Sequence, residues 1–253
     1  MSYYKEGAQE FGKRASISVD NVGGAAGAID ITATIPAEWD DFWDVVDASG
    51  NELRVCGNTG TTKLTYALSG FNKTNRTGTI QVKSYNAPAG GMLQIFLYWA
   101  APGAAAGSAV VALAAPKTGY IETCGPANGN IVRAGQPRPN DDRPPKQIAK
   151  GTDESRYLWF DIRNILAARL TPGNGKLLCD EISYASYTVT LAGVAQAGMI
   201  DATKTRFYDG FVKVLLKAGT TGVDYTVVPL LTTTEGEVLA PRAWLRVRDQ
   251  KES

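Results

Sequence analysis

Carboxylates gather in one stretch of the chain, EWDDFWDVVDASGNELRV at residues 38–55. Such a cluster could bind calcium, supply the acid pair of a glycosidase, or form the polar rim of a β-sheet. Its six acids are Glu38, Asp40, Asp41, Asp44, Asp47 and Glu52. Their spacing lacks the alternating order of a calcium loop, and acids within one turn do not oppose each other across a cleft as glycosidase acids do. We therefore expect a polar turn with its acids in water and with Trp39, Phe42 and Trp43 packed onto the sheet.

The absence of histidine removes several kinds of chemistry. It excludes Ser-His-Asp and Cys-His nucleophiles, histidine-ligated zinc and histidine general bases. The three cysteines, Cys56, Cys124 and Cys179, are too far apart for a C-x-x-C site and too few for a disulfide framework. We expect buried free thiols, with an intermolecular disulfide as the alternative. Since the sequence also lacks a phosphate loop, it predicts no catalytic residue, no metal site and no cofactor.

Charge gives no indication of an anionic partner. Lys plus Arg number 26 and Asp plus Glu number 25, so no summed field steers the protein toward nucleic acid or an anionic membrane. The stretches MLQIFLYWAA and AAAGSAVVALAA are too short, or too rich in Gly and Ala, to span a bilayer, and MSYYKEGAQEFGKR has no signal-peptide core. We expect a soluble protein with neither nucleic acid nor membrane as a partner.

The first part of the chain has the two-residue period of β-strands. AIDITATI places its isoleucines and Ala33 on one face and Asp30 on a solvated face. GTIQVKSY repeats the pattern, and LQIFLYW is apolar on both faces, as in a central strand. Short strands separated by Gly, Asn and Pro turns predict an antiparallel β-sandwich or jelly roll over residues 1–115.

A Pro-rich segment follows. Six of the twelve prolines lie between Pro116 and Pro145, and AGQPRPNDDRPPKQIAKG is polar and charged. Proline removes a backbone donor and disrupts helices and sheets, so residues 116–151 are predicted to be an extended linker or clamp. A solvated spacer is the simpler interpretation. The alternative is a docking arm that uses Arg138 and Arg143.

The remaining chain, residues 152–253, also has a strand pattern. YLWFDI alternates like a strand, and RNILAARL gives about two helical turns before TPGNG. The further strands are predicted in KLLCDEISY, SYTVTLA, FVKVLLKAG, VDYTVVPLLTTTEGE and AWLRVRD. Gly219, Gly222 and Gly236 are suited to the tight turns between them. These elements predict a second sandwich.

Both parts resemble known families. KRASISVDN, DFW, SGNELRV, TKLTYALSGFN, GTIQV and LQIFLYWAAPGAA follow in the order of a concanavalin-like domain of unknown function from microbial surface and phage tail proteins, over residues 11–109. YLWFDIRNIL and VLLKAGTTGVDYTVVPLLTTTEGEVLAPRAWLRVRD resemble the immunoglobulin-like domain of phage virion proteins, including fibre-to-tail adaptors, over residues 152–249. The resemblances imply an all-β protein of two sandwiches, concanavalin-like or jelly-roll and then immunoglobulin-like, joined by the Pro-rich linker.

The last predicted strand has one basic and aromatic face. Its outward residues are Arg242, Trp244, Arg246 and Arg248, and Ala243, Leu245 and Val247 face the other way. Alternating cations and a ring could bind an acidic protein, a sugar or nucleic acid, and a solvated strand face explains the pattern equally well. A protein partner is the preferred functional interpretation, because Trp and Arg are enriched in interface hot spots. The candidate interface residues are therefore Trp244 and Arg246, together with Arg138 and Arg143 of the linker.

These observations predict a structural function. The preferred hypothesis, which the resemblances imply, is a non-enzymatic bacteriophage virion protein, folded in the host cytoplasm and built in as multiple copies at the tail, neck or fibre junction. Its partners would be other virion proteins and copies of itself. The alternatives are a capsid decoration protein and a carbohydrate-binding module for host-surface glycans, since concanavalin-like sandwiches often carry sugar sites. A glycoside-cleaving enzyme is the most distant alternative.

Overall fold

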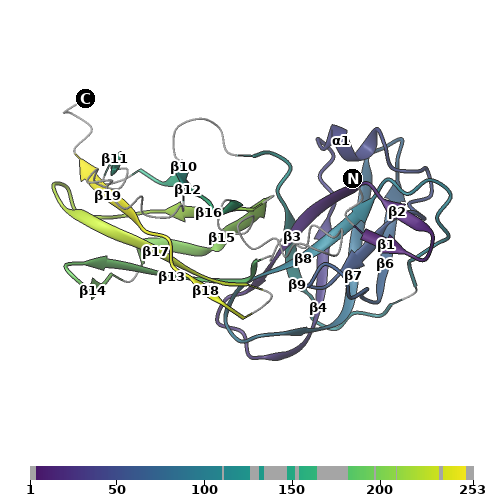
Figure 1. The fold of residues 1–253 in the computed structure, drawn as a ribbon, viewed down its shortest axis with the longest axis horizontal. Coiled ribbons are helices and arrows are strands. Elements are labelled where there is room, and N and C mark those ends of the chain that lie inside the picture. The colour runs from purple at the N-terminus through teal and green to yellow at the C-terminus, as the bar shows by residue number, and fades with distance from the viewer. Residues whose placement is uncertain are drawn as a thin grey trace, which may run out of the picture. The chain divides into compact units, whose positions relative to one another are not determined.

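The computed structural model describes residues 4–109, 111–125, 131–133, 147–151, 154–163, 182–196, 198–208, 210–233 and 236–248. Nearly all regular structure in this part of the chain is β-strand, with one short helix, α1 (Asp40–Trp43) (Figure 1). The all-β fold class predicted from the strand periods is therefore confirmed. Among the described residues, no helix has the length and apolar character needed to span a membrane.

The chain divides into two compact units. One comprises Met1–Cys124 with Phe207–Asp209, and the other comprises Gly125–Arg206 with Gly210–Ser253. The more specific assignments, a concanavalin-like sandwich over residues 1–115 and an immunoglobulin-like sandwich over residues 152–253, stay predictions. Each unit is described separately below.

The described residues of the first unit form nine strands. They are β1 (Tyr4–Glu6), β2 (Gln9–Phe11), β3 (Lys13–Asn21), β4 (Gly27–Thr34), β5 (Arg54–Cys56), β6 (Tyr66–Asn72), β7 (Thr77–Ala87), β8 (Gly91–Trp99) and β9 (Lys117–Ile121). Seven of them pair in the order β5, β8, β3, β9, β4, β7, β6. Among the described strands, β1 and β2 pair only with each other, as a separate hairpin.

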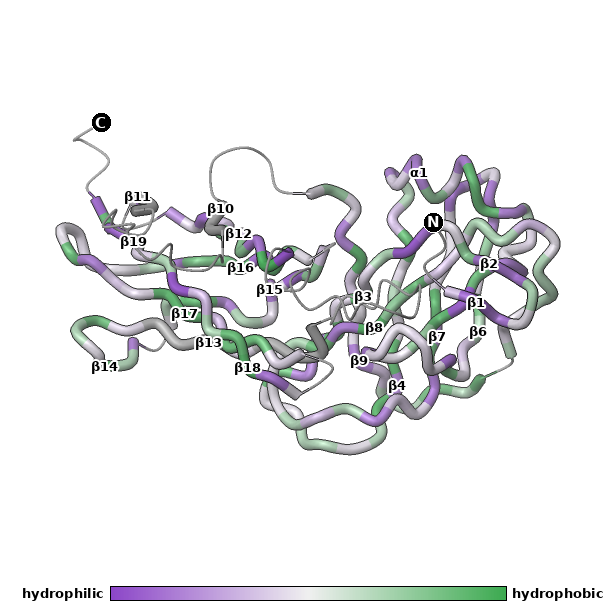
Figure 2. Tube along the Cα trace, in the orientation of Figure 1, coloured by the Kyte–Doolittle hydropathy of each residue, from purple (hydrophilic) through white to green (hydrophobic). Residues whose placement is uncertain are grey.

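The burial pattern of these strands follows their sequence period. In β7, Ile80 and Val82 are buried, whereas Gln81 between them and Lys83 after them are partly exposed. Every residue of β8 is buried, as predicted for a central strand from a sequence that is apolar on both faces. Figure 2 shows the apolar character of β8 along the tube. Burial of these side chains supplies the main driving force for folding of this unit.

The predicted linker is wrong for residues 117–121. These residues form β9, which pairs antiparallel with β3 and parallel with β4. Gly119 explains how this strand fits, because a Cβ at this position would lie 2.9 Å from Ala33 Cβ and 3.0 Å from Ile17 Cγ2. Only a residue without a side chain leaves room for the neighbouring strands. The same interval supplies β10 (Ile131–Arg133) and β11 (Gln147–Gly151), so the linker prediction is also wrong for these two strands.

The described residues of the second unit form two groups of paired strands. Its strands are β10 (Ile131–Arg133), β11 (Gln147–Gly151), β12 (Arg156–Asp161), β13 (Ile182–Leu191), β14 (Val194–Ala195), β15 (Ile200–Tyr208), β16 (Phe211–Leu216), β17 (Asp224–Thr233), β18 (Val238–Leu239) and β19 (Ala243–Arg248). One sheet has the order β11, β19, β17, β13, with β14 on β13 and β18 on β17. The other sheet has the order β10, β12, β16, β15.

Strand pairing in the second unit is mixed. β10 runs parallel to β12, and β11 runs parallel to β19, whereas β12 and β16, and likewise β17 and β19, pair antiparallel. Parallel neighbours need long connections, and the segments that supply β10 and β11 lie inside the interval predicted to be a linker. The strands predicted around residues 156–162, 211–216, 224–233 and 243–248 are confirmed. The helix predicted in RNILAARL lies outside the described residues, apart from its first residue.

Candidate functional site

Helix α1 forms the acidic turn between β4 and β5. Phe42 and Trp43 are buried, and Trp39 stacks on Phe42 with ring centroids 4.9 Å apart. Trp99 of β8 meets Trp39 and Phe42 edge-on, at centroid distances of 4.9 and 5.5 Å. Trp43 donates its indole N–H to the Pro36 carbonyl over 2.8 Å. Burial of aromatic side chains therefore holds the turn, and the predicted packing of Trp39, Phe42 and Trp43 is confirmed.

The acids on the outer side of α1 bind a surface arginine. Arg76 donates hydrogen bonds to Asp40 and, over 3.3 Å, to Asp44. These two carboxylates are 72% and 68% exposed, so the ion pairs are solvated and contribute little to stability. Within the described ranges, no group of three or more acidic, cysteine or histidine side chains is placed to hold a metal ion.

Asp47 and Glu52 organise the loop after α1. The Asp47 carboxylate accepts the backbone N–H groups of Ser49 and Asn51 over 2.8 and 3.1 Å. Burial raises the pKa of Asp47, but hydrogen bonds from Ser49 and Asn51 outweigh this and bring it below its usual value. Glu52 is buried, and its oxygens accept the N–H groups of Asp47 and Ala101 over 2.9 and 3.0 Å. The expectation of acids in water is therefore wrong for Glu52, because buried backbone donors need an acceptor.

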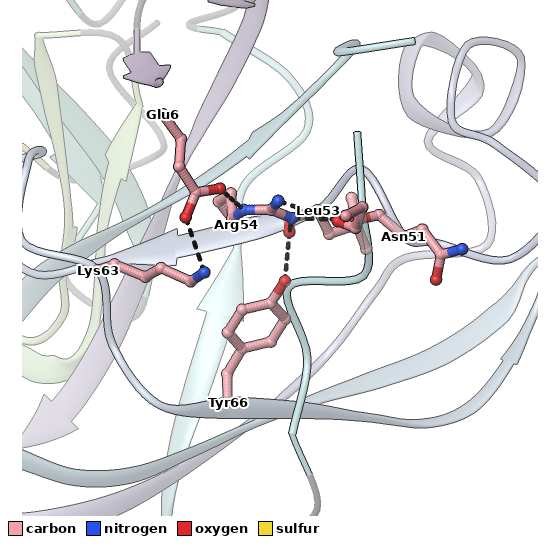
Figure 3. A network of polar contacts seen from close by, with 7 residues as sticks. Glu6, Asn51, Leu53, Arg54, Lys63 and Tyr66 are labelled. Atoms are coloured by element: carbon pink, nitrogen blue, oxygen red, sulfur yellow. Dashed lines mark hydrogen bonds and ion pairs between the residues drawn. The ribbon is translucent and has the colours of Figure 1, made fainter. Parts of the chain in front are cut away.

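Arg54 of β5 is the centre of a buried polar network (Figure 3). Its side chain is only 4% exposed. The guanidinium donates to the Glu6 carboxylate of β1 and to the carbonyls of Leu53, Asn51 and Ala105, over 2.7, 3.0 and 3.0 Å for the carbonyls. One side chain thus joins the β1–β2 hairpin, the loop before β5 and the segment after β8.

Tyr66 and Gly107 complete the surroundings of the guanidinium. Tyr66 donates its hydroxyl to the Leu53 carbonyl, which also accepts from Arg54. Burial raises the pKa of Tyr66 to about 12, so the hydroxyl keeps its proton at neutral pH. A Cβ at Gly107 would lie 2.3 Å from Arg54 Nη1 and 2.7 Å from Tyr66 Oη. The segment after β8 can approach the guanidinium only because it has glycine there.

The β1–β2 hairpin covers a buried thiol. Glu6 accepts a hydrogen bond from Lys63 over 2.8 Å, and this bond lowers the pKa of Glu6. Tyr4 stacks on Tyr98 at 5.1 Å and packs against the cluster that contains Cys56. Burial raises the pKa of Cys56 to about 12, which leaves the thiol protonated and unreactive at neutral pH. The network is therefore suited to fastening the hairpin and not to activating a nucleophile.

Asp30 of β4 is a second polar anchor. The expectation of a solvated Asp30 is wrong, since the residue is 8% exposed. It accepts the N–H groups of Ala114 and Ser84 over 2.7 and 3.0 Å and the amine of Lys83 over 2.9 Å. These bonds, that from Ala114 first, lower the pKa of Asp30 to about 2. The register of β4 and β7 shifts at this residue, which removes it from the regular alternation.

Of the predicted interface residues, the structure describes Trp244 and Arg246, which lie on the outward face of β19. The inward residues Ala243, Leu245 and Val247 are buried, which confirms the predicted alternation. Trp244 is 41% exposed, Arg248 is exposed, and Arg246 forms an ion pair with Asp224 of β17 over 2.9 Å. β11 and β17 pair with the two edges of β19, so Trp244 and Arg246 stand on a strand fixed from both sides.

The other predicted residues divide into two groups. Arg138, Arg143 and Cys179 lie outside the described residues. Cys56 is a buried free thiol as predicted, whereas Cys124 is free but exposed, because it lies in the loop that follows β9. The sequence interpretation did not identify Arg54. The available signal was a charged residue inside the apolar strand ELRV.

No protein-family model matches this chain, and no curated protein matches it. The relationships to concanavalin-like and immunoglobulin-like domains therefore remain predictions from the quoted motifs. A functional proposal for this chain has to rest on its own residues and their geometry.

Proposed function

We propose that this chain is a non-enzymatic structural protein of a bacteriophage particle, built in as multiple copies at the tail, neck or fibre junction. The resemblance of both parts of the sequence to phage virion domains supports the proposal. The structural observation that carries it is the outward face of β19, where exposed Trp244 lies between Arg242 and Arg246 on a strand whose inward face is buried. A ring flanked by guanidinium groups is typical of the residues that dominate protein interfaces.

The rigidity of this face favours binding without a large ordering cost. β19 is hydrogen-bonded on both edges, so a partner meets a strand that is already in place. The buried charged groups of the first unit are committed to the fold instead. Arg54, Glu52 and Asp30 each bind main-chain groups of neighbouring segments. The geometry therefore favours a protein that acts through its surface.

The direct test is to look for the chain in purified particles. Mass spectrometry should find it there, and imaging should locate it at the tail, neck or fibre junction. Trp244→Ala and Arg246→Ala should leave the isolated protein folded and reduce its incorporation, because both residues are on the outward face. Lys204→Ala, which removes an exposed cation from β15, is the matched control and should leave incorporation unchanged.

Three results would contradict the proposal or change its details. Unchanged incorporation of both variants, together with tight binding of the monomer to a defined oligosaccharide, would replace it with a carbohydrate-binding module, which an exposed Trp244 ring would also suit. Turnover of a glycan, ester or peptide substrate that is lost in Asp41→Asn or Asp44→Asn would show an enzyme. A position on the capsid surface would make the chain a decoration protein.

A further inference from the structure

The β19 face combines an apolar centre with an excess of positive charge. Successive outward residues of a strand are roughly 7 Å apart, so Trp244, Arg246 and Arg248 of β19 form a row about 14 Å long, and Arg242, directly before the strand, extends this row at one end. Asp224 lies opposite Arg246 and is bonded to it. Arg242 and Arg248 at the two ends of the row are exposed. The face thus presents a half-exposed indole within a net positive rim.

The acidic turn of the first unit has the complementary pattern. Its exposed acids are Glu38, Asp40, Asp41 and Asp44. Among these acids, Arg76 bonds to Asp40 and Asp44, and the amine of Lys73 donates to the carbonyls of Asp44 and Val46. The four carboxylates therefore outnumber the two cations at the turn, and Glu38 and Asp41 supply the excess negative charge. Val45, one helical turn after Asp41, is 46% exposed. This turn presents a half-exposed apolar residue within a net negative rim.

We propose that the β19 face of one copy docks on the acidic turn of a second copy, head to tail. The inference rests on the proposed function, in which the chain acts as repeated copies, and it names the partner of that same face. Trp244 would cover Val45, and the arginines of the row would bind the carboxylates of the turn. A guanidinium can bind a carboxylate through two parallel hydrogen bonds, which gives specificity as well as affinity once water is excluded.

A head-to-tail contact has a structural consequence. The two patches consist of different residues, so the contact is heterologous and can generate a ring or a filament when it repeats. Such a contact suits a component that is present in many copies. A nucleic acid fits the face less well, because Asp224 within the row repels phosphate groups.

Charge reversal tests this docking directly. The first variant is Arg242→Glu with Arg248→Glu, which reverses the ends of the row and keeps the Arg246–Asp224 pair. The second is Glu38→Lys with Asp41→Lys, which reverses the turn and keeps the bonds of Arg76. Lys13→Glu with Lys204→Glu changes two other exposed cations and is the charge-matched control. Circular dichroism confirms that each full-length variant is folded, and sedimentation velocity over a concentration series measures self-association at low and high salt.

The wild type should self-associate reversibly, and salt should weaken the association because it screens the charges. Each reversed variant alone should associate at least ~10-fold more weakly, since like charges would then face each other. An equimolar mixture of the two reversed variants should restore association, because each supplies the charge that the other now needs. The control should behave like the wild type.

Several results would overturn the inference. A wild type that stays monomeric at every concentration, or a mixture that fails to associate, would do so. Retained self-association of the first variant together with loss of binding to an oligonucleotide would assign the face to nucleic acid instead. If the self-association test fails but the chain is present in purified particles, the docking inference is refuted and the proposed function stands. If the chain is absent from particles, the proposed function is refuted whatever the self-association test shows.

Discussion

Replacing Arg54 by methionine should destabilise the first unit far more than replacing Glu6, its ionic partner, or Lys63, which pairs with the same carboxylate. Arg54→Met keeps an apolar stem of similar length and removes the guanidinium. The structure gives that group four acceptors, namely the carbonyls of Asn51, Leu53 and Ala105 and the carboxylate of Glu6. All four would lose a charged donor at once.

The size of the destabilisation depends on which other partners each acceptor keeps once the guanidinium is removed. Removing one partner of a buried ion pair costs about 3–5 kcal/mol, because the other is stranded without water. Glu6 is 35% exposed and keeps its bond to Lys63, so it is only partly stranded. The Leu53 carbonyl also keeps the Tyr66 hydroxyl. We therefore expect the lower end of that range, about 3 kcal/mol, for Arg54→Met.

Two variants serve as controls for this value. Glu6→Gln keeps an oxygen that can accept from Arg54, whose three carbonyl partners remain, so about 1 kcal/mol is expected. Lys63→Met removes an exposed partner of the same carboxylate and should cost less than about 1 kcal/mol, as surface ion pairs do. Urea unfolding followed by circular dichroism and by tryptophan fluorescence measures all three. Equal losses for the three variants, or a loss below about 1 kcal/mol for Arg54→Met, would refute a buried, fully bonded guanidinium.

Three further predictions concern other anchors of the first unit. The pKa of Asp30 is lowered to about 2 from an ordinary 3.8, so its stabilisation is full above pH 4 and is lost as pH falls toward 2; Asp30→Asn should flatten the acid limb of a stability–pH curve. Gly119→Ala should cost about 1–3 kcal/mol in urea unfolding, since its Cβ would lie 2.9 Å from that of Ala33. A thiol reagent should modify exposed Cys124 rapidly and buried Cys56 only on unfolding, which peptide mapping can check; fast modification of Cys56 would contradict its burial.

The sequence predicts the features that depend on local period. The alternation in β7 and β19, the apolar residues on both faces of β8 and the burial of Trp43 all follow from side chains that lie two residues apart or cluster within one turn. Local period cannot, however, reveal β9 as a member of the first sheet, because its partners β3 and β4 are distant in sequence. The sequence feature that indicates this membership is Gly119, and it is informative only once the neighbouring strands are known.

The polar anchors escape sequence analysis for the same reason. Arg54 and Glu6 are 48 residues apart, and Asp30 and Ala114 are 84 residues apart. No spacing rule connects residues at such separations. In addition, a carboxylate in an alternating strand is normally on the wet face, so Asp30 was assigned there by a rule that its register shift breaks. Charged residues inside apolar strands are better taken as candidates for buried pairs with distant main-chain groups.

These anchors converge on one segment, the alanine-rich connection between β8 and β9. Small side chains bury little apolar area, so this connection cannot hold itself to the sheet by hydrophobic packing alone. Its main chain is bound instead: Ala101 to Glu52, Ala105 to Arg54, Ala109 to the Tyr66 carbonyl and Ala114 to Asp30. Three buried charged side chains, those of Glu52, Arg54 and Asp30, thus hydrogen-bond to main-chain groups of this connection that would otherwise need water. Because the buried charges of this unit are committed in this way, the docking that we propose would use its outward residues, the acidic turn among them.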